Sequence, residues 1–251
     1  MKSVGIIPAR YASSRFEGKT LADILGKPMI QHVYERACMS KMLSQVIVAT
    51  DDQRIYDAVI GFGGNAQMTR ECATGTDRVS IVAENLACDV VVNIQGDEPL
   101  LEPQQIDIML QPFIEKPSVQ VCTLKERIHT MDDLLNRNVV KVVTNLEGDA
   151  LYFSRGSIPS TPANKQQIFD ENALVYRHIG LYAFRKEQLL AFTSWKRTPY
   201  EIAEGLEQLR FLEHGVPIHV VETDTSLIGV DVPADLERVK QILEKRGNER
   251  Q

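Results

Sequence analysis

The sequence lacks the signals of several common protein classes. Its four cysteines form no C-x-x-C pair and have no histidine at zinc-finger spacing, so a metal–thiolate site is not expected. We interpret all four as buried thiols of a reducing compartment. No stretch approaches the roughly eighteen apolar residues of a membrane span, and the apolar run near the N-terminus is too short for a signal peptide. These absences predict a cytoplasmic protein without membrane insertion.

An excess of positive charge is also missing. The chain has 28 lysines and arginines against 34 aspartates and glutamates, for a net charge of −6. Nucleic-acid-binding proteins usually present a basic face, so no nucleic-acid partner is expected. A small anionic substrate in a local basic pocket is compatible with this balance. The 251 residues, of which 43% are apolar and 25% charged, suit a soluble globular chain of one large or two small domains.

The first half of the chain alternates buried strands with helices. Short apolar runs at residues 3–9, 45–52 and 89–99 are each bounded by turn chemistry, as buried strands are. Residues 28–37 and 52–64 between them have helical patterns. This alternation predicts a parallel sheet with helical crossovers. Ligands of such sheets bind outside the carboxyl ends of the strands, where all three runs place polar residues.

The second half is more mixed. Strands are expected at 119–128, 139–154 and 175–186, the second of these ranges holding a pair of strands joined by a Glu147-Gly148 turn. A helix is expected at 202–215 with Ile202, Leu206, Leu209 and Leu212 inward, although Gly205 inside it costs up to about 1 kcal/mol relative to Ala. Two further segments complete the expectation: an exposed loop at 159–172 and a last helix at 230–245.

Positive charge gathers in one loop directly after the first strand. Arg10, Arg15 and Lys19 lie within ten residues, and Ser13-Ser14 and Gly18 allow close approach of backbone amides. Such a loop, followed by the positive end of a helix, suits a triphosphate. A solvated basic loop is the competing interpretation. The loop is neither a G-x-x-x-x-G-K-[ST] nor a G-x-G-x-x-G motif.

Triphosphate chemistry calls for a divalent cation with oxygen ligands. Asp97 follows a buried strand, and Asp231 precedes the last helix. Asp97 could instead cap a turn, and Asp231 could order the start of that helix. Glu98, Asp51 and Asp52 compete for the same role, and the residues alone do not choose among them.

Several motifs resemble one enzyme family in order along nearly the whole chain, from about residue 4 to residue 243. They read IIPARYASSRFEGKTLADILGKPMIQHVYERA, VATDDQRI, GTDRV, VVNIQGDEPLL, ALYFSRGSIP, HIGLYAFRK, LEQLRFLEHG and GVDVPADLERV. This series is similar to the 3-deoxy-manno-octulosonate (Kdo) cytidylyltransferases. The resemblance implies that CTP and Kdo are converted to CMP-Kdo and pyrophosphate with magnesium, for lipopolysaccharide assembly in the cytoplasm.

The resemblance also implies an architecture. We expect an α/β, nucleotide-diphospho-sugar transferase fold, with a mostly parallel central sheet flanked by helices and a smaller sugar-binding and dimerisation part. The chain would form a single cytidylyltransferase domain over 1–251 and assemble as a homodimer. Within it, approximately 1–120 would bind CTP, 121–215 would bind the sugar and dimerise, and 216–251 would return to the main sheet and form the C-terminal helix.

The same resemblance assigns roles to residues. Arg10, Lys19, Asp97 and Asp231 would form the catalytic set, with Asp97 and Asp231 as the magnesium ligands. The other residues of the CTP site would be Pro8, Ala9, Ser13, Arg15, Thr74 and Arg78. Kdo would be surrounded by Gln95, Arg155, His178, Tyr182, Glu207 and Gln208. Without the resemblance, His178 reads as a satisfied strand histidine, Glu207 as a helix-surface charge and Tyr182 as plain core.

The expected reaction is an in-line displacement at the α-phosphorus of CTP by the anomeric 2-hydroxyl of Kdo, in which magnesium acidifies the hydroxyl and a second ion helps pyrophosphate leave. No residue stands out as a general base. Glu17 departs from the family, whose loop has proline there, and would weaken CTP binding if it faced the phosphates. Alternatives are a cytidylyltransferase for 8-amino-8-deoxy-Kdo or a sialic acid, or a catalytically silent regulator. Asp97, Asp231, Lys19 and Arg155 argue against silence.

Overall fold

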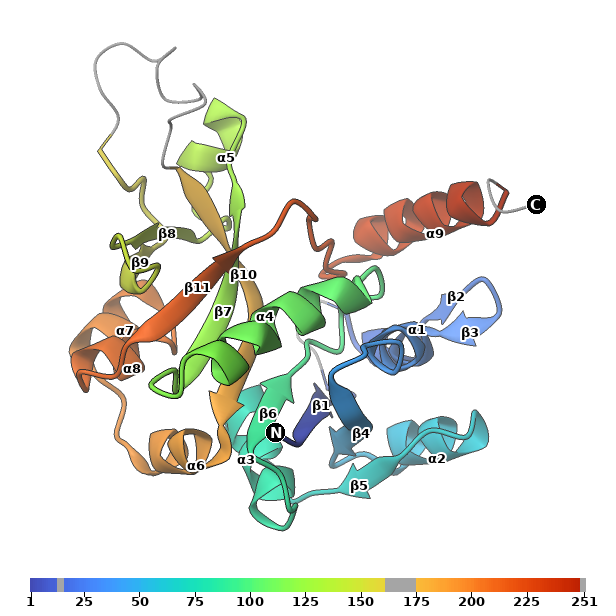
Figure 1. Cartoon of the computed structure of the whole chain (residues 1–251). Coiled ribbons are helices and arrows are strands. Elements are labelled where there is room, and N and C mark those ends of the chain that lie inside the picture. The colour runs from blue at the N-terminus through green and yellow to red at the C-terminus, as the bar shows by residue number, and fades with distance from the viewer. Residues whose placement is uncertain (13–15, 161–174, 249–251) are drawn as a thin grey trace. The chain divides into compact units, whose positions relative to one another are not determined.

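The computed structural model describes residues 1–12, 16–160 and 175–248, and their contacts divide the chain into two compact units (Figure 1). Unit 1 consists of Met1–Asp107 and Leu227–Gln251, and unit 2 of Ile108–Ser226. The boundary falls inside helix α4 (Pro103–Glu115). These bounds assign no ligand to either unit, so the division into CTP-binding and sugar-binding parts stays a prediction.

Unit 1 is built on a parallel sheet. Its strands are β1 (Ser3–Ala9), β4 (Leu43–Thr50), β5 (Ala66–Met68) and β6 (Val90–Asn93), and their order is β6-β1-β4-β5. All three pairings are parallel, and β1 runs between β4 and β6. Strands β1 and β6 and the last five residues of β4 are mostly buried, which is why they read as continuous apolar runs, whereas the edge strand β5 is partly exposed. This part of the chain confirms the predicted mostly parallel α/β architecture.

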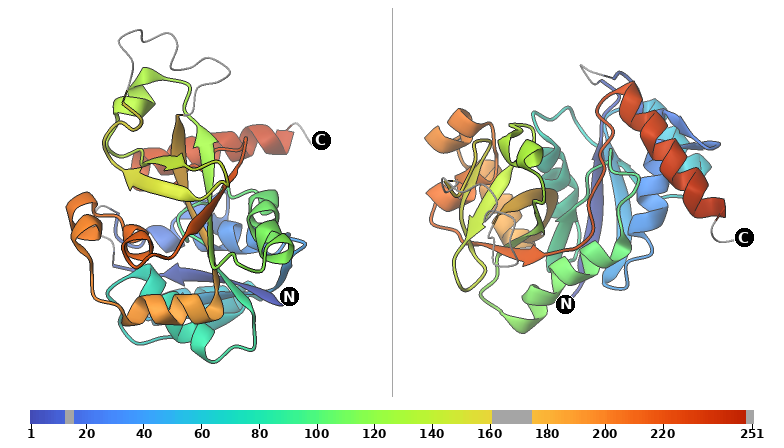
Figure 2. Two further views of the ribbon diagram at one scale, coloured as in Figure 1. Left: turned by 60° about the vertical axis from the view of Figure 1, so that its left-hand side comes forward. Right: turned by 90° about the horizontal axis from the view of Figure 1, so that it is seen from above.

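Helices cover both faces of this sheet. Helices α1 (Met29–Ala37) and α2 (Gln53–Gly61) connect β1 to β4 and β4 to β5, whereas α3 (Gly75–Glu84) returns the chain to β6 on the other side of β1. Because parallel crossovers are right-handed, this reversal of direction places α3 on the opposite face from α1 and α2 (Figure 2). The ends of β1 and β6 therefore lie side by side with a helix layer on each face.

The C-terminal helix α9 (Pro233–Asn248) completes unit 1 beside the short strands β2 (Asp23–Ile24) and β3 (Lys27–Pro28) (Figure 2, right). The 3-10 helix η1 (Lys19–Leu21) precedes these strands. Apolar side chains from segments far apart in the sequence join here in one cluster, which contains Ile24, Met29, Leu100, Val230, Leu236 and Val239. This packing holds the chain before α9 against the loop that follows β1.

Unit 2 contains a mixed sheet. Strand β7 (Val121–Arg127) pairs antiparallel with β10 (Tyr176–Arg185) and parallel with β11 (Ile218–Glu222). Strand β8 (Lys141–Thr144) joins β10 to β9 (Ala150–Ser154) through antiparallel pairs. The chain turns between β8 and β9 at Asn145–Gly148, where Gly148 has a φ of 86° that favours glycine. The predicted hairpin is confirmed.

The described part of unit 2 also contains four short helices: α5 (Met131–Leu135), α6 (Lys186–Ser194), α7 (Pro199–Glu204) and α8 (Leu209–Glu213). Aromatic rings tie these helices to the sheet. The Phe211 ring of α8 stacks on Phe192 of α6 at 4.2 Å between centroids and on Phe184 of β10 at 5.7 Å. No helix in the described ranges is both long and apolar enough to cross a membrane.

The single helix predicted at 202–215 is wrong. The chain forms α7 and α8 instead, because Gly205 adopts a left-handed conformation with a φ of 65° and ends α7. The break changes the helix phase, so Ile202 is 60% exposed while Leu206 and Leu209 are buried. Gly205 is therefore a C-cap, where glycine is favoured, rather than a costly residue inside a helix.

The exposure of the cysteines and of the loop at 159–172 can be compared with the predictions. The prediction that all four cysteines are buried is wrong, because only Cys122 is buried, Cys72 and Cys88 are half-buried and Cys38 is exposed; all four are free thiols. In the predicted loop at 159–172, Pro159 and Ser160 are exposed, and the rest lies outside the described residues.

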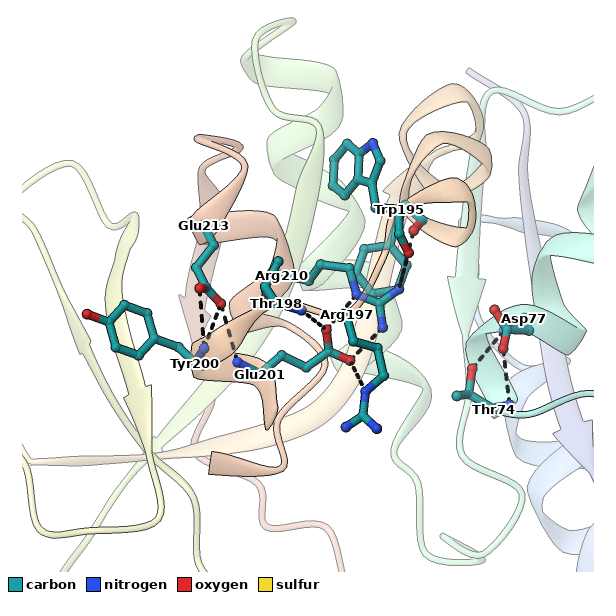
Figure 3. A network of polar contacts seen from close by, with 10 residues as sticks. Thr74, Asp77, Trp195, Arg197, Thr198, Tyr200, Glu201, Arg210 and Glu213 are labelled. Carbon is teal, nitrogen blue, oxygen red and sulfur yellow. Dashed lines mark hydrogen bonds and ion pairs between the residues drawn. The ribbon is translucent and has the colours of Figure 1, made fainter. Parts of the chain in front are cut away.

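A buried ion pair holds α7 and α8 together (Figure 3). Arg210 Nε donates to Glu201 Oε2 at 2.7 Å, and its Nη2 donates to Oε1 at 2.5 Å. Glu201 is only 1% exposed and also accepts from Arg197 Nε and the backbone N–H of Thr198. Burial alone would raise the pKa of the Glu201 carboxyl, but the hydrogen bonds from Arg210 and Thr198 outweigh it and hold this pKa below its ordinary value.

We predict that Glu201→Gln destabilises the protein by about 3–5 kcal/mol, because it leaves the buried Arg210 guanidinium without a counter-charge. Urea unfolding at pH 7 measures this loss. A depressed carboxyl pKa contributes stability above its unfolded value of about 4.3, and this contribution is lost as pH falls through the folded pKa. The difference between the wild type and the variant should therefore shrink at acid pH.

The matched control is Glu237→Gln, which removes an exposed carboxylate paired with Lys240 on α9. Exposed pairs contribute about 0–1 kcal/mol, so its urea midpoint should barely move. Equal midpoints for Glu201→Gln and the wild type at pH 7 would contradict the stabilising role of the pair.

Candidate functional site

A cavity of about 350 Å³ opens in unit 1 at the carboxyl ends of β1 and β6. This is where the parallel-sheet rule places a ligand. Nine residues that the sequence singled out line it, namely Pro8, Ala9, Arg10, Lys19, Thr74, Arg78, Gln95, Asp97 and Asp231. Five lining residues were missed: Thr20, Cys72, Ala73, Gly75 and Gly96. Most of these lie next to a predicted residue in the sequence. Their small side chains, which let a ligand approach closely, were the feature that could have indicated them.

Two glycines of the cavity wall approach the end of β1, and at Gly96 the approach leaves little room for a side chain. A Cβ atom on Gly96 would lie 3.1 Å from the backbone oxygen of Pro8, and one on Gly75 would lie 3.4 Å from Pro8 Cγ. Larger residues at Gly96 would push the turn that carries Asp97 away from β1. The glycine of the GDEP motif thus sets the distance between the two strand ends.

Lys19 lies between the two predicted metal-binding carboxylates. Its Nζ donates to Asp97 Oδ2 at 2.6 Å and to the backbone oxygen of Val230 at 2.9 Å, and it lies 3.6 Å from Asp231 Oδ1. The Val230 N–H in turn donates to the backbone oxygen of Asp97 at 2.8 Å. The start of η1, the turn after β6 and the segment before α9 therefore converge on one cation.

The other candidate metal ligands, Glu98, Asp51 and Asp52, differ from these two carboxylates in their surroundings. Glu98 is half-buried, and desolvation together with the neighbouring Asp97 carboxylate raises the pKa of its carboxyl to about 8, which disfavours the charged form that a metal ion would bind. Asp52 caps α2 and binds the Arg54 guanidinium. Asp51 binds Arg78. Neither Asp51, Asp52 nor Glu98 lines the cavity.

A carboxylate other than that of Asp231 accepts hydrogen bonds at the start of α9. The backbone N–H groups of Asp231 and Val232 donate to Asp235 Oδ2, so the side chain of Asp235 orders the start of α9. Two carboxylates that both face one ammonium provide hard oxygen donors of the kind that magnesium takes from proteins, usually one or two beside substrate phosphates. No group of three or more acidic, histidine or cysteine side chains in the described ranges could hold a metal ion by itself.

Helix α3 forms the opposite wall. Thr74 and Asp77 form a capping box in which Thr74 Oγ1 accepts from the Asp77 N–H and Asp77 Oδ2 accepts from the Thr74 N–H (Figure 3). This cap fixes the first turn of α3, which carries Arg78. Arg78 is 4% exposed, and its guanidinium donates to Asp51 and to Thr69.

The loop after β1 behaves as predicted only in part. Arg10 and Lys19 line the cavity, whereas Ser13 and Arg15 lie outside the described residues. Glu17 is exposed. The other cation of this region, Lys27, pairs with Glu35 of α1 and does not line the cavity.

Contacts with Tyr11 hold the ends of this loop in place. The N–H of Gly18 donates to the backbone oxygen of Tyr11 at 3.0 Å, and the Arg54 guanidinium lies 3.3 Å from the centre of the Tyr11 ring. Gly18 has a φ of 69°, and a Cβ atom there would lie 3.0 Å from this ring.

Three of the predicted sugar residues lie together in unit 2. His178 and Tyr182 of β10 have ring centroids 5.2 Å apart, and His178 Nε2 lies 3.0 Å from Thr123 Oγ1. Burial lowers the pKa of His178 to about 3, so its ring is neutral at physiological pH. Burial and the Glu207 carboxylate raise the pKa of Tyr182 well above its ordinary value. Neutral polar groups of this kind suit hydroxyl recognition.

The remaining sugar candidates are more dispersed. Gln95 lines the cavity of unit 1, and Gln208 is buried beside α8 in unit 2. The Arg155 guanidinium donates to the backbone oxygens of Glu204 and Arg137, and its own backbone oxygen accepts from Lys141 Nζ. Lys141 is 0% exposed, and sequence reasoning missed this buried contact to Arg155 because a strand lysine usually faces solvent.

Comparison with known proteins shows what this chain is similar to. A family model described as Cytidylyltransferase matches residues 4–221. The 3-deoxy-manno-octulosonate cytidylyltransferase of Geotalea uraniireducens (strain Rf4) is 55% identical, over 98% of this chain and 100% of that protein. The protein of the same name from Geobacter sulfurreducens (strain ATCC 51573 / DSM 12127 / PCA) is 52% identical, over 97% and 100%.

The fold has a close counterpart among solved structures. The structure of CMP:2-keto-3-deoxy-manno-octonic acid synthetase complexed with CTP matches with a TM-score of 0.92 at 42% identity, over 98% of this chain and 100% of that chain. The match spans both units and agrees with the motifs found along the sequence. The chain therefore belongs to the 3-deoxy-manno-octulosonate cytidylyltransferase family.

Proposed function

We propose that this chain transfers CMP from CTP to 3-deoxy-D-manno-octulosonate (Kdo) and releases pyrophosphate. The observation that carries the proposal is the convergence of Lys19, Asp97 and Asp231 on one cavity at the strand ends of unit 1. Relatives that carry this activity in their names match the chain over nearly its full length. The product would be the activated sugar for lipopolysaccharide biosynthesis.

The cavity suits CTP in both charge and size. Arg10 and Lys19 would bind the phosphates, Lys19 as a compact point charge and Arg10 with forked donors, and Ser13 and Arg15 of the same loop would assist. Pro8, Ala9, Thr74 and Arg78 would line the cytidine pocket. Binding CTP would move Lys19 from a contact with two carboxylates to one with phosphate oxygens, which also carry negative charge.

Magnesium fits the arrangement of Asp97 and Asp231. Both carboxylates face the same ammonium, so a small divalent cation placed between them would meet at least one oxygen from each. The ion would neutralise phosphate charge and make the attacking hydroxyl more acidic. Because the described residues offer no third acidic, histidine or cysteine ligand, the remaining positions would be filled by substrate oxygens and water.

The reaction we propose is an in-line displacement. The anomeric 2-hydroxyl oxygen of Kdo forms a bond to the α-phosphorus of CTP, the bond from that phosphorus to the pyrophosphate oxygen breaks, and the hydroxyl proton leaves to solvent. Lys19 and Arg10 would stabilise the charge on the departing pyrophosphate. The chain's contribution is thus to bind, orient and neutralise, without a protein general base.

Recognition of Kdo would fall to six side chains. Arg155 would bind the sugar carboxylate, and neutral His178 would exchange hydrogen bonds with hydroxyls. The other proposed contacts are Gln95, Tyr182, Glu207 and Gln208. These residues are also the ones that would discriminate Kdo from 8-amino-8-deoxy-Kdo or a sialic acid.

We also propose a homodimer in the cytoplasm. Unit 2 exposes four large apolar side chains on β9, on α7 and in the β8–β9 turn, namely Leu146, Leu151, Tyr200 and Ile202, which supports a partner surface there. The cytoplasmic location is supported by the four free thiols and by CTP as a substrate.

The direct test measures pyrophosphate release from CTP, Kdo and magnesium by the purified protein. We expect release that depends on Kdo and stops with EDTA, because the metal offsets repulsion between two anionic substrates. Parallel reactions with 8-amino-8-deoxy-Kdo and sialic acid rank the sugar acids. Faster release with another sugar acid would reassign the substrate, and no release with any of them by folded protein would favour a silent regulator.

A second prediction concerns Asp97. Asp97→Asn removes one of the two proposed metal carboxylates while keeping its size, so kcat should fall at least about 100-fold. The matched control is Asp107→Asn, since Asp107 binds Ser40 Oγ at 2.6 Å in the same unit but does not line the cavity. Normal turnover by a folded Asp97→Asn protein would exclude the metal assignment.

The dimer is tested by sedimentation velocity. We expect the wild type to sediment at twice the chain mass, and Leu151→Asp with Tyr200→Asp to shift it to the monomer, because charges would be buried in an apolar contact. Ile60→Asp, an exposed apolar position on α2, serves as the control and should stay dimeric. A monomeric wild type, or a double variant that stays dimeric, would contradict the proposal.

A further inference from the structure

Behind the cavity wall of unit 1, two residues that do not line the cavity hold one that does. Arg78 Nη2 donates to Asp51 Oδ2 at 2.6 Å, and Arg78 Nη1 donates to Thr69 Oγ1 at 2.6 Å. Arg78 lines the cavity, whereas Asp51 and Thr69 do not. Asp51 and Thr69 can therefore act on a ligand in the cavity through the orientation of Arg78.

The three residues come from three different elements. Asp51 directly follows β4, Thr69 directly follows β5, and Arg78 lies on α3. The N–H of Thr69 donates to the backbone oxygen of Thr50 at 2.8 Å, which joins the ends of β4 and β5 behind the guanidinium. The two acceptors thus sit on a rigid edge of the sheet and restrict the plane of the guanidinium.

The charge balance explains why this contact matters. Arg78 is 4% exposed, and a buried guanidinium needs a counter-charge, which the Asp51 carboxylate supplies. Asp51 accepts from Nη2 of the planar group, and Thr69 accepts from Nη1. A guanidinium has five N–H donors and no acceptor, so the donors that remain have a direction set by the Asp51 and Thr69 contacts.

A fixed donor discriminates between pyrimidine bases. Cytosine presents an acceptor at N3 beside its O2 acceptor, whereas uracil carries a hydrogen at N3. A guanidinium N–H directed at this edge is satisfied by cytosine and faces another donor in uracil. Discrimination of this kind is strong only where the polar group is held in place, since a mobile arginine adapts to either base.

We propose that Asp51, assisted by Thr69, is a positioning residue that orients Arg78 and thereby sets the preference of this enzyme for CTP over UTP. This inference rests on the proposed function, in which Arg78 lines the cytidine pocket, and takes its guanidinium to face the cytosine ring there. It assigns a role to Asp51 other than the metal binding considered from the sequence. It also gives Thr69 a function that no sequence motif marks.

The test measures CTP and UTP affinity by calorimetry and the kinetic constants for CTP, UTP and Kdo. In Asp51→Ala, we expect the ratio of CTP to UTP affinity to fall at least about 10-fold, and the KM for CTP to rise with little change in kcat or in the KM for Kdo. Asp51→Asn keeps one oxygen acceptor and should recover part of the ratio.

A second substitution guards against misfolding of the Asp51→Ala protein, in which Arg78 is left buried without its counter-charge. Thr69→Val keeps the shape of the side chain and removes only the acceptor of Arg78 Nη1, so it should lower the CTP-to-UTP ratio by a few-fold, and its melting temperature should fall less than that of Asp51→Ala because the Asp51 counter-charge remains. The matched control is Asp107→Asn, which should leave the ratio unchanged.

The outcomes separate this inference from the proposed function. An unchanged CTP-to-UTP affinity ratio in folded Asp51→Asn and Thr69→Val proteins overturns the positioning role. Equal loss of both affinities also overturns it, because a merely structural contact would weaken both nucleotides alike. The calorimetric ratio does not depend on turnover, so a wild type that binds CTP but transfers no CMP would refute the proposed function and leave the positioning role supported or overturned by its own measurement.

Discussion

The arrangement of the cavity in unit 1 depends on the contacts that the Lys19 ammonium makes. It joins the turn after β6 and the segment before α9 to the loop that follows β1, through Asp97, Val230 and Asp231. Two carboxylates facing each other across a small space would repel, and the lysine offsets this repulsion. If another cation replaced the Lys19 ammonium between the two carboxylates, their repulsion would still be offset. Lys19 could then bind the phosphates.

Buried arginine–carboxylate pairs recur in both units with different consequences. In unit 2, Arg210 and Glu201 join α7 to α8. In unit 1, Arg78 lines the cavity and Asp51 binds its guanidinium from outside the lining, so this pair restricts the orientation of a cavity-lining group. Removing one partner of either pair should lower the free energy of unfolding, because the other charge would stay buried without a counter-charge.

Sequence patterns correctly predicted the main strands and helices of unit 1. They failed in unit 2, where a single residue ends a helix. The runs that became β1, β4 and β6 are continuous and apolar, so their burial followed from composition. The helix expected at 202–215 broke at Gly205, since a glycine tolerated inside a helix and one that ends it look alike in one sequence. The sequence also left five acidic residues as candidate metal ligands. Only their contacts in the folded chain distinguish Asp97 and Asp231 from Asp51, Asp52 and Glu98.

By itself, the sequence determined the family, the alternation of strands and helices, and most residues of the cavity, because these depend on local periodicity and on motifs of neighbouring residues. Only the tertiary structure decided which carboxylates share a cation and that Asp51 and Thr69 bind the Arg78 guanidinium. Lys19 and Val230 are 211 positions apart, and no pattern along the chain encodes a contact made by folding over that distance.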